Sequence, residues 1–288
     1  MKIGVFGNLT SPRATAKMIG DFGRRAEAAG LDSIWLGEHV VLFDEMEFPY
    51  PGSRDGRIPM PKGGGMLDTV ATFGYLAAVT STLRFGTGIT LIPQRNPVYT
   101  ANEFATLDWL SEGRMDFGIG VGWCKEEVLA CGYSWHDRGK RCDEFLELIQ
   151  QLWTQDVVEF KGNHIEVTGA KLDPKPVQDV LPTIVGGHSA AAIRRAVKYG
   201  QGWYGFALTP ELTSPILDDI KSALAEAGRS QDDFEIVITP SSVKNDDVVR
   251  EFRDLGVDRL VVQLGSNRED NVSAKLVELE SMVSVAAG

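Results

Sequence analysis

A carboxylate and an imidazole stand side by side in the stretch DSIWLGEHVVL, residues 32–42. Glu38 and His39 directly follow an apolar run that indicates a buried strand. Because an imidazole exchanges protons near neutral pH, this pair is suited to acid–base chemistry. Neighbouring residues of a strand point to opposite faces, so we expect only one of the two to face a site at the strand end. The alternative is that both side chains cap the strand and bond to loop backbone.

Two glycine-rich stretches, GIGVGW (118–123) and IVGGHS (184–189), also end apolar runs. Glycine lets backbone N–H groups approach a ligand closely, and the start of a helix favours an anion. The second stretch precedes AAAIRRA, so it fits a phosphate-binding turn in which Ser189 is the helix N-cap. The alternative is a tight turn with an ordinary serine cap. The dinucleotide-binding glycine fingerprint does not fit, since no GxGxxG opens a helix after the first strand.

Further candidate residues each allow two interpretations. Arg95, after TGITLIP (87–93), is either an anion-binding residue or a solvated loop arginine. Trp123 and Trp203, near the ends of expected strands, are either apolar walls of a substrate pocket or packing residues at its rim.

Strand-like and helix-like segments alternate along the chain and must position these residues. The expected strands are 2–6, 32–37, 83–92, 114–122, 181–187, 202–208, 234–240 and 257–264, and a helical pattern follows each. Such repeats predict a parallel (β/α)₈ TIM barrel, with a doubly wound sheet as the alternative. In a barrel the active site lies at the carboxyl ends of the strands, which is where the residues above fall.

Two segments break the rhythm. Residues 43–66 are rich in Pro and Gly and lack a period, which predicts a long insertion loop. Residues 157–167 read as a β-hairpin excursion. No linker suggests a second domain, so we expect one domain over 1–288.

Composition excludes several classes of function. Asp and Glu outnumber Lys and Arg by 40 to 29, and no basic run appears, which disfavours nucleic-acid binding. No stretch approaches the roughly 18 apolar residues of a membrane span, and the N-terminus lacks the features of a signal peptide. The three cysteines lack CxxC spacing, which argues against a disulfide framework or a zinc site. We therefore expect a cytoplasmic protein without a metal.

Over nearly its whole length the chain resembles the luciferase-like flavin superfamily, and within it the oxidoreductases that use the deazaflavin coenzyme F420. The resemblance rests on AEAAGLDSIWLGEHVVL, FGTGITLIPQRNPVYTANEFATLDWLSEGRMDFGIGVGW, RCDEFLELIQQLW and PTIVGGHSAAAIRRAVKYGQGWYGF, in this order. It implies a TIM barrel with insertion segments and a cofactor ring across the barrel mouth. It also implies a non-prolyl cis peptide at Gly88-Ile89. The cofactor-binding residues would then be Gly88, Ile89, Asn96, Gly120, Val121, Gly122, Gly186, Gly187, His188 and Ser189.

The resemblance also assigns roles within the pair. Glu38-His39 matches an acidic residue and a catalytic histidine of the deazaflavin-dependent sugar-phosphate dehydrogenases, so His39 is expected to be catalytic and Glu38 to support it. A catalytic glutamate of those dehydrogenases falls at Trp123, which argues against the same substrate. The flavin mononucleotide luciferases carry an arginine near the position of Val121 and a glutamate at the position of Gly187. Both are absent from this chain, which favours F420 over FMN.

The expected function is thus an F420-dependent oxidoreductase that transfers a hydride to or from a small organic substrate. The alternatives are an FMN-dependent monooxygenase and a non-catalytic flavin-binding protein. A phosphate-ester lyase barrel is disfavoured because no expected strand clearly ends in lysine. The resemblance suggests a homodimer. Three cations of the insertion loop would either meet the cofactor's acidic tail or an anionic substrate, or be solvated; these are Arg54, Arg57 and Lys62.

Overall fold

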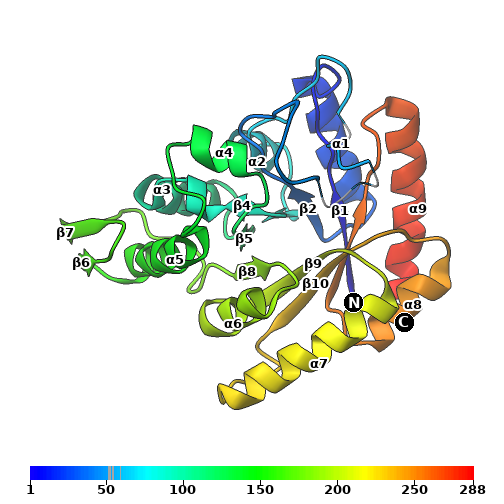
Figure 1. The fold of residues 1–288 in the computed structure, drawn as a ribbon. Coiled ribbons are helices and arrows are strands. Elements are labelled where there is room, and N and C mark those ends of the chain that lie inside the picture. The colour runs from blue at the N-terminus through cyan, green and yellow to red at the C-terminus, as the bar shows by residue number, and fades with distance from the viewer. Residues whose placement is uncertain (51–52, 54, 59) are drawn as a thin grey trace.

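The computed structural model describes residues 1–50, 53, 55–58 and 60–288. Within these residues, parallel strands close into a barrel surrounded by helices (Figure 1). The barrel strands are β1 (Lys2–Phe6), β2 (Ser33–Leu36), β3 (Arg84–Thr87) with its continuation β4 (Thr90–Leu91), β5 (Met115–Gly120), β8 (Thr183–Gly186), β9 (Gly202–Leu208), β10 (Glu235–Pro240) and β11 (Arg259–Gln263). The ring closes because β3 pairs directly with β5, with Phe85 beside Met115. The predicted (β/α)₈ barrel is therefore confirmed, and the doubly wound sheet is wrong.

The helices form the outer layer and begin where the sequence supplies an N-cap. Thr15, Asp68 and Ser189 each accept a hydrogen bond from a backbone N–H of the first turn that follows. The helices are α1 (Ala16–Ala28), α2 (Thr69–Ala77), α3 (Pro97–Leu110), α4 (Lys125–Ala130), α5 (Arg138–Thr154), α6 (Ala190–Tyr199), α7 (Pro210–Glu226), α8 (Asp246–Asp254) and α9 (Glu269–Ala287). Their apolar faces and the outward side chains of the strands make the main core.

The third barrel strand differs from the continuous strand expected over 83–92. It breaks at Gly88-Ile89, whose peptide bond is cis, resumes as β4, and then turns into a 3₁₀ helix, Ile92–Gln94. Pro93 explains the early end, because proline has no N–H to donate to a neighbouring strand. The apolar run 83–92 therefore includes residues that are not part of a strand.

An ion cluster and an aromatic layer fill the barrel interior. Arg259 is only 1% exposed and donates to Asp116 at 2.6 Å, and it also pairs with Glu235 at 2.8 Å. Above this cluster, the rings of Trp35 and Tyr204 stack with centroids 5.3 Å apart. The ion cluster and the stacked rings therefore separate the mouth of the barrel from the amino ends of the strands.

The two insertions lie outside the ring. The expected hairpin is present as β6 (Val158–Lys161) and β7 (Glu166–Ala170), so it extends three residues beyond the predicted end at 167. Between β2 and α2 the described residues form the expected long loop, joined to the chain near Thr10 by a bridge at Met66.

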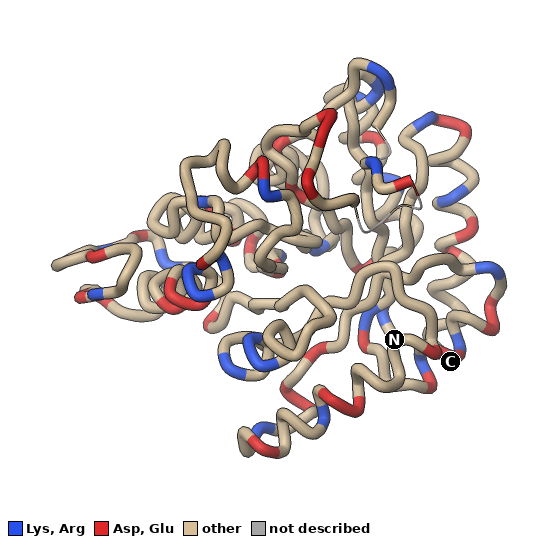
Figure 2. The backbone as a smooth tube through the Cα atoms, in the orientation of Figure 1, with Lys and Arg blue, Asp and Glu red and all other residues tan. Residues whose placement is uncertain are grey.

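Charges and termini complete the arrangement. Lys and Arg are interspersed with Asp and Glu along the chain (Figure 2). The two ends lie close together, and the amino group of Met1 donates to the carbonyl of Ala286 at 3.4 Å (Figure 1). Among the described helices, none is long and apolar enough to cross a membrane.

Candidate active site

A cavity of about 830 Å³ opens at the mouth of the barrel. This volume falls within the range of roughly 300–1,000 Å³ that is usual for small-molecule sites. Its walls come from the ends of the strands and from described parts of the long loop, including Tyr50, Met60 and Met66. Described residues of the predicted insertion loop therefore form part of the cavity wall.

His39 lies in this cavity and is held by a buried carboxylate. Its Nδ1 is 2.7 Å from Oε2 of Glu127, whose other oxygen accepts the backbone N–H of Val40 at 2.6 Å. The Glu127 side chain is fully buried in the first turn of α4. Because a carboxylate only accepts, it places a proton on Nδ1 of His39. The described residues give Nε2 no hydrogen-bond partner, so this nitrogen is available to a ligand.

Aromatic rings cover the His39 side of the cavity. Trp123 meets the imidazole edge-on, with centroids 5.7 Å apart and an interplanar angle of 73°. Tyr50 lies against Trp123 at 5.4 Å. These packed rings restrict the motion of the imidazole.

Glu38 also lines the cavity but has a different partner. It is 8% exposed, accepts from Nη1 of Arg95 at 2.8 Å and from the N–H of Leu91 at 3.4 Å. Burial raises the pKa of Glu38 to about 7, and the positive charge of Arg95 opposes this rise. Arg95 also pairs with Glu103, so it is neither solvated nor free to bind an anion, and both interpretations of it are wrong.

The expectation that only one of Glu38 and His39 faces the site is also wrong. The strand β2 ends at Leu36, so strand alternation does not extend to the pair. Both residues lie in the loop that follows, and both line the cavity.

Glycines shape the floor around the cis bond. Ile89 fits between Gly120 and Gly186, where an added Cβ would come within 2.0 Å and 3.0 Å of its side chain. At Gly88 an added Cβ would lie 2.9 Å from the ring of Phe6. A side chain at these positions would displace Ile89 or fill the floor, so glycine is required for the present shape.

The turn before α6 is suited to an anion. Gly187 has φ +117°, which favours glycine, and Ser189 caps the helix by accepting from Ala192 at 3.2 Å. The first turn of α6 carries no acidic residue. Nε2 of His188 accepts the backbone N–H of Phe206 at 3.2 Å, and burial lowers the pKa of this imidazole. The N–H of Gly187 already donates to the carbonyl of Tyr204 at 3.3 Å, so an anion beside this turn would be favoured by the dipole and the first-turn N–H groups of α6.

The family is decided by a model match over most of the chain. Residues 1–260 match the model of the luciferase-like monooxygenases. The chain belongs to this family.

Relatives and solved structures agree with the match. An uncharacterized protein of Mycobacterium tuberculosis is 31% identical over 239 residues, covering 83% of this chain and 82% of the relative. An F420-dependent glucose-6-phosphate dehydrogenase of Amycolatopsis mediterranei is 30% identical over 242 residues, 78% of this chain and 66% of that enzyme. The structure of an F420-dependent secondary alcohol dehydrogenase, in complex with an F420-acetone adduct, superposes with a TM-score of 0.80 at 19% identity, covering 99% of this chain and 98% of that one. This luciferase-like chain is thus similar to enzymes that use F420.

Most site residues predicted from the sequence line the cavity of this luciferase-like protein. They are Glu38, His39, Gly88, Ile89, Val121, Gly122, Trp123, Gly186, Gly187 and His188. Four others are not among the lining residues: Asn96, Gly120, Ser189 and Trp203.

Each of these four residues instead supports the local structure. Asn96 accepts from the first turn of α3 as its N-cap, and Ser189 caps α6. Gly120 makes room for Ile89. Trp203 is fully buried and donates from its indole to the carbonyl of Gly187 at 2.7 Å, so it supports the turn rather than forming a wall.

Two functional candidates were missed by the sequence analysis. Glu127 lies 88 positions after His39, and only the closed ring brings them together. Arg13, in the segment between β1 and α1, also lines the cavity. Of the insertion-loop cations, Arg54 lies outside the described residues, and Arg57 and Lys62 are not among the lining residues.

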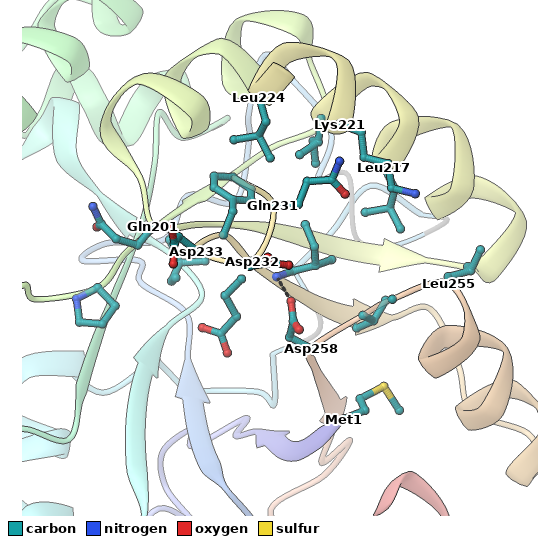
Figure 3. Close-up of a pocket in the computed structure, with 18 of the residues that line it drawn as sticks. Met1, Gln201, Leu217, Lys221, Leu224, Gln231, Asp232, Asp233, Leu255 and Asp258 are labelled. Carbon is teal, nitrogen blue, oxygen red and sulfur yellow. Dashed lines mark hydrogen bonds between the residues drawn. The ribbon is translucent and has the colours of Figure 1, made fainter. Parts of the chain in front are cut away.

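A second cavity, of about 890 Å³, lies at the amino ends of the strands. Leu217, Leu224 and Leu255 form part of its wall, and Asp258 accepts the N–H of Ile236 at 2.7 Å (Figure 3). Among the described residues that line it, none is His or Cys. The candidate histidines His39 and His188 thus lie at the mouth and not in this second cavity.

Proposed function

We propose that this chain is an F420-dependent oxidoreductase, which transfers a hydride between the deazaflavin and a small organic substrate. The observation that carries the proposal is the position of the His39–Glu127 pair in a glycine-floored cavity that also contains an anion-suited turn. The relative named an F420-dependent glucose-6-phosphate dehydrogenase, and the fold neighbour named an F420-dependent alcohol dehydrogenase, support the choice of coenzyme.

The residues present fit the coenzyme. A flat ring needs a floor without protruding side chains, and Gly88 and Gly186 supply one that a Cβ would disturb. The phosphate of the coenzyme would be held by the N–H groups at the start of α6, where an anion is favoured. The ring would lie over Gly88 and Ile89.

In such an enzyme the bound deazaflavin supplies or accepts the hydride. The protein's part is to hold and move a proton. Nε2 of His39 gives a proton to the substrate oxygen, or takes one from it, while Glu127 holds Nδ1 and fixes the orientation of the ring. Trp123 packs edge-on against the imidazole, with Tyr50 against Trp123, and so helps to hold its orientation.

The test replaces the proton carrier and leaves the cofactor site intact. For His39→Ala we expect F420 to bind with nearly the wild-type affinity, measured by quenching of its fluorescence, while hydride transfer falls roughly 100- to 10,000-fold, the usual contribution of a general acid or base. His136→Ala, at an exposed histidine outside the cavity, is the matched control and should change neither quantity. Unchanged turnover in His39→Ala would refute the assignment. Binding without any turnover in the wild-type protein would instead favour a non-catalytic flavin-binding protein.

A further inference from the structure

The long insertion is anchored to the segment between α4 and α5 by contacts outside the mouth cavity. The ring of Phe48 stacks on the indole of Trp135, with centroids 5.6 Å apart and an interplanar angle of 22°. The guanidinium carbon of Arg138 lies 3.6 Å from the centroid of the same indole. Glu47, the neighbour of Phe48, forms an ion pair with Lys125 at the start of α4. None of these five described residues lines the cavity, so the contacts hold the insertion in place without forming the cavity wall.

A second anchor joins the other end of the insertion to the loop after β1. The N–H of Ser11 donates to the carbonyl of Gly65 at 2.9 Å, and Oγ of Ser11 accepts from the N–H of Gly65 at 2.9 Å. In the ring of strands, β3 and β2 lie between β5 and β1. The described part of the insertion is therefore held on the β5 side and on the β1 side of the mouth, and between the two anchors it contributes Tyr50, Ile58 and Met60 to the lining of the cavity.

Tyr50 connects the first anchor to His39. It lies two residues after Phe48, and Pro49 stands between them. Proline has a fixed φ and restricts the residue before it, so the backbone between the two rings is stiff. The ring of Tyr50 packs on Trp123 with centroids 5.4 Å apart, and Trp123 meets the imidazole of His39 edge-on at 5.7 Å. Packed rings and stiff backbone thus run from the anchor to the imidazole.

The imidazole of His39 depends on this packing because its own hydrogen bond fixes only one of its atoms. Nδ1 is held by Glu127 at 2.7 Å, and the described residues give Nε2 no partner. One hydrogen bond leaves the ring free to tilt, and tilting moves Nε2 farthest because this nitrogen lies at the far side of the ring. Proton transfer needs Nε2 within about 2.6–3.2 Å of the reacting group. The contact with Trp123 therefore sets the direction in which Nε2 points.

We propose that Phe48 and Trp135 are positioning residues for proton transfer at His39. Their stacking docks the insertion and places Tyr50 on Trp123, and Trp123 then aims Nε2 of the imidazole. The bearing of this alignment on catalysis rests on the proposed function, in which Nε2 exchanges a proton with the substrate. The insertion is thus a lid whose docked position completes the site from an anchor outside the cavity.

The first measurement is hydrogen exchange at the backbone N–H of Glu47. This N–H is hydrogen-bonded to a side chain of α4 at 2.8 Å, so it exchanges when the insertion undocks. An aromatic pair changes an equilibrium of this kind by a factor of roughly 2 to 12. Phe48→Ala should therefore speed the exchange of this N–H roughly 2- to 12-fold. Phe48→Tyr keeps a ring on Trp135 and should restore the wild-type rate.

The second measurement follows the imidazole of His39 by NMR in protein labelled with ¹⁵N-histidine. The chain has four histidines, and His39→Ala assigns the signals. Tyr50→Ala removes the ring that packs on Trp123 and should shift the His39 signals, whereas Tyr50→Phe keeps the ring and should leave them in place. Phe48→Ala should shift the signals along the same line as Tyr50→Ala and by a smaller amount, because docked and undocked populations are averaged.

Tyr75→Ala is the matched control. Tyr75 lies on α2, outside the cavity, and like Phe48 it is 40% exposed. Its replacement should change neither the exchange of Glu47 nor the signals of His39. Phe48→Ala and the control should both bind F420 with nearly the wild-type affinity, measured by fluorescence quenching, since neither residue lines the cavity.

The outcomes separate the two proposals. An unchanged exchange rate at Glu47 in Phe48→Ala would show that the stack does not dock the insertion, and would overturn the positioning role. Faster exchange with unmoved His39 signals would overturn it as well, because the insertion would then be anchored without aiming the imidazole. Failure of F420 to bind the wild-type protein would refute the proposed function instead, and both measurements on the cofactor-free protein would still decide whether the lid positions His39.

Discussion

Glu127→Gln isolates the part that the buried carboxylate plays in proton transfer. Glu127 is fully buried and bonds His39 at 2.7 Å and the N–H of Val40 at 2.6 Å, so the two oxygens have separate partners. In the variant the amide oxygen keeps one acceptor role, and we expect it to stay with Val40. The NH₂ group then faces Nδ1 of His39 and forces this nitrogen to accept. The neutral imidazole therefore carries its proton on Nε2 and cannot take another without losing the new bond.

The size of the loss in rate follows from the hydrogen bond between Glu127 and His39 that the variant removes. A hydrogen bond to a charged group contributes about 1.5–3 kcal/mol, which corresponds to a loss of roughly 10- to 150-fold in rate if the bond is needed in the transition state. The loss should appear in kcat and leave the affinity for F420 unchanged. Because the Glu side chain and Gln have the same shape, the melting temperature should move little.

The assay is hydride transfer followed over a range of pH, with F420 affinity measured on the same samples. Glu126→Gln is the matched control, because Glu126 precedes Glu127 on α4 and bonds the backbone N–H of Glu47 instead of His39. A role confined to folding would lower the melting temperature and F420 affinity and leave kcat and its pH profile as in the wild type. Folded Glu127→Gln protein with a kcat within about twofold of the wild type would refute the positioning role.

Four further predictions concern the site and its support. Burial raises the pKa of Glu38 from 4.5 to about 7, so its contribution to the free energy of unfolding is present below about pH 4.5 and is lost as pH rises through about 7. The free energy of unfolding, measured with urea across that range, should therefore fall by about 3 kcal/mol, and Glu38→Gln should remove this pH dependence. Asp116→Asn leaves the buried Arg259 with less countercharge and should lower the free energy of unfolding by roughly 3–5 kcal/mol; a loss below about 1 kcal/mol would contradict the structural role of the cluster. Gly187→Ala forces a side chain into φ +117° and should cost about 1–3 kcal/mol and weaken F420 binding, read out by thermal melting and fluorescence titration. If the chain forms the expected homodimer through the exposed apolar face of α3, where Leu110 is 63% exposed, Leu110→Lys should shift it toward monomer in sedimentation experiments; an unchanged distribution would exclude this face.

The barrel was predictable because its signal is local. Apolar runs of strand length alternate with helical stripes, and caps such as Ser189 mark the helix starts, so each element can be recognised from a short window. The end of the third barrel strand was not predictable, because the mostly apolar run 88–92 contains both the break at Gly88-Ile89 and the start of a 3₁₀ helix at Ile92. Apolar character predicts burial and does not distinguish a strand from a buried 3₁₀ turn.

The site was predictable only in part, because its polar contacts join residues far apart in the chain. Nothing in the spacing links His39 to Glu127 or Glu38 to Arg95; the closed ring brings together the loops after β2, β4 and β5. One signal was available for Glu127, which lies seven residues past the end of β5 and therefore near the mouth. Trp203 was predicted to line the pocket and is instead fully buried. An aromatic residue near a strand end is as well suited to the core as to a pocket wall, so the sequence could not distinguish the two positions.

The identity of the coenzyme is the central claim, and one measurement tests it most directly. Purified cofactor-free protein is titrated with F420 and, in parallel, with FMN, and the fluorescence quenching of each is followed at equal concentrations. The structure and its relatives predict saturable binding of F420 with one coenzyme per chain, and no saturable binding of FMN. Saturable binding of FMN together with no binding of F420 would contradict the account and would assign the chain to the flavin-dependent monooxygenases of its family.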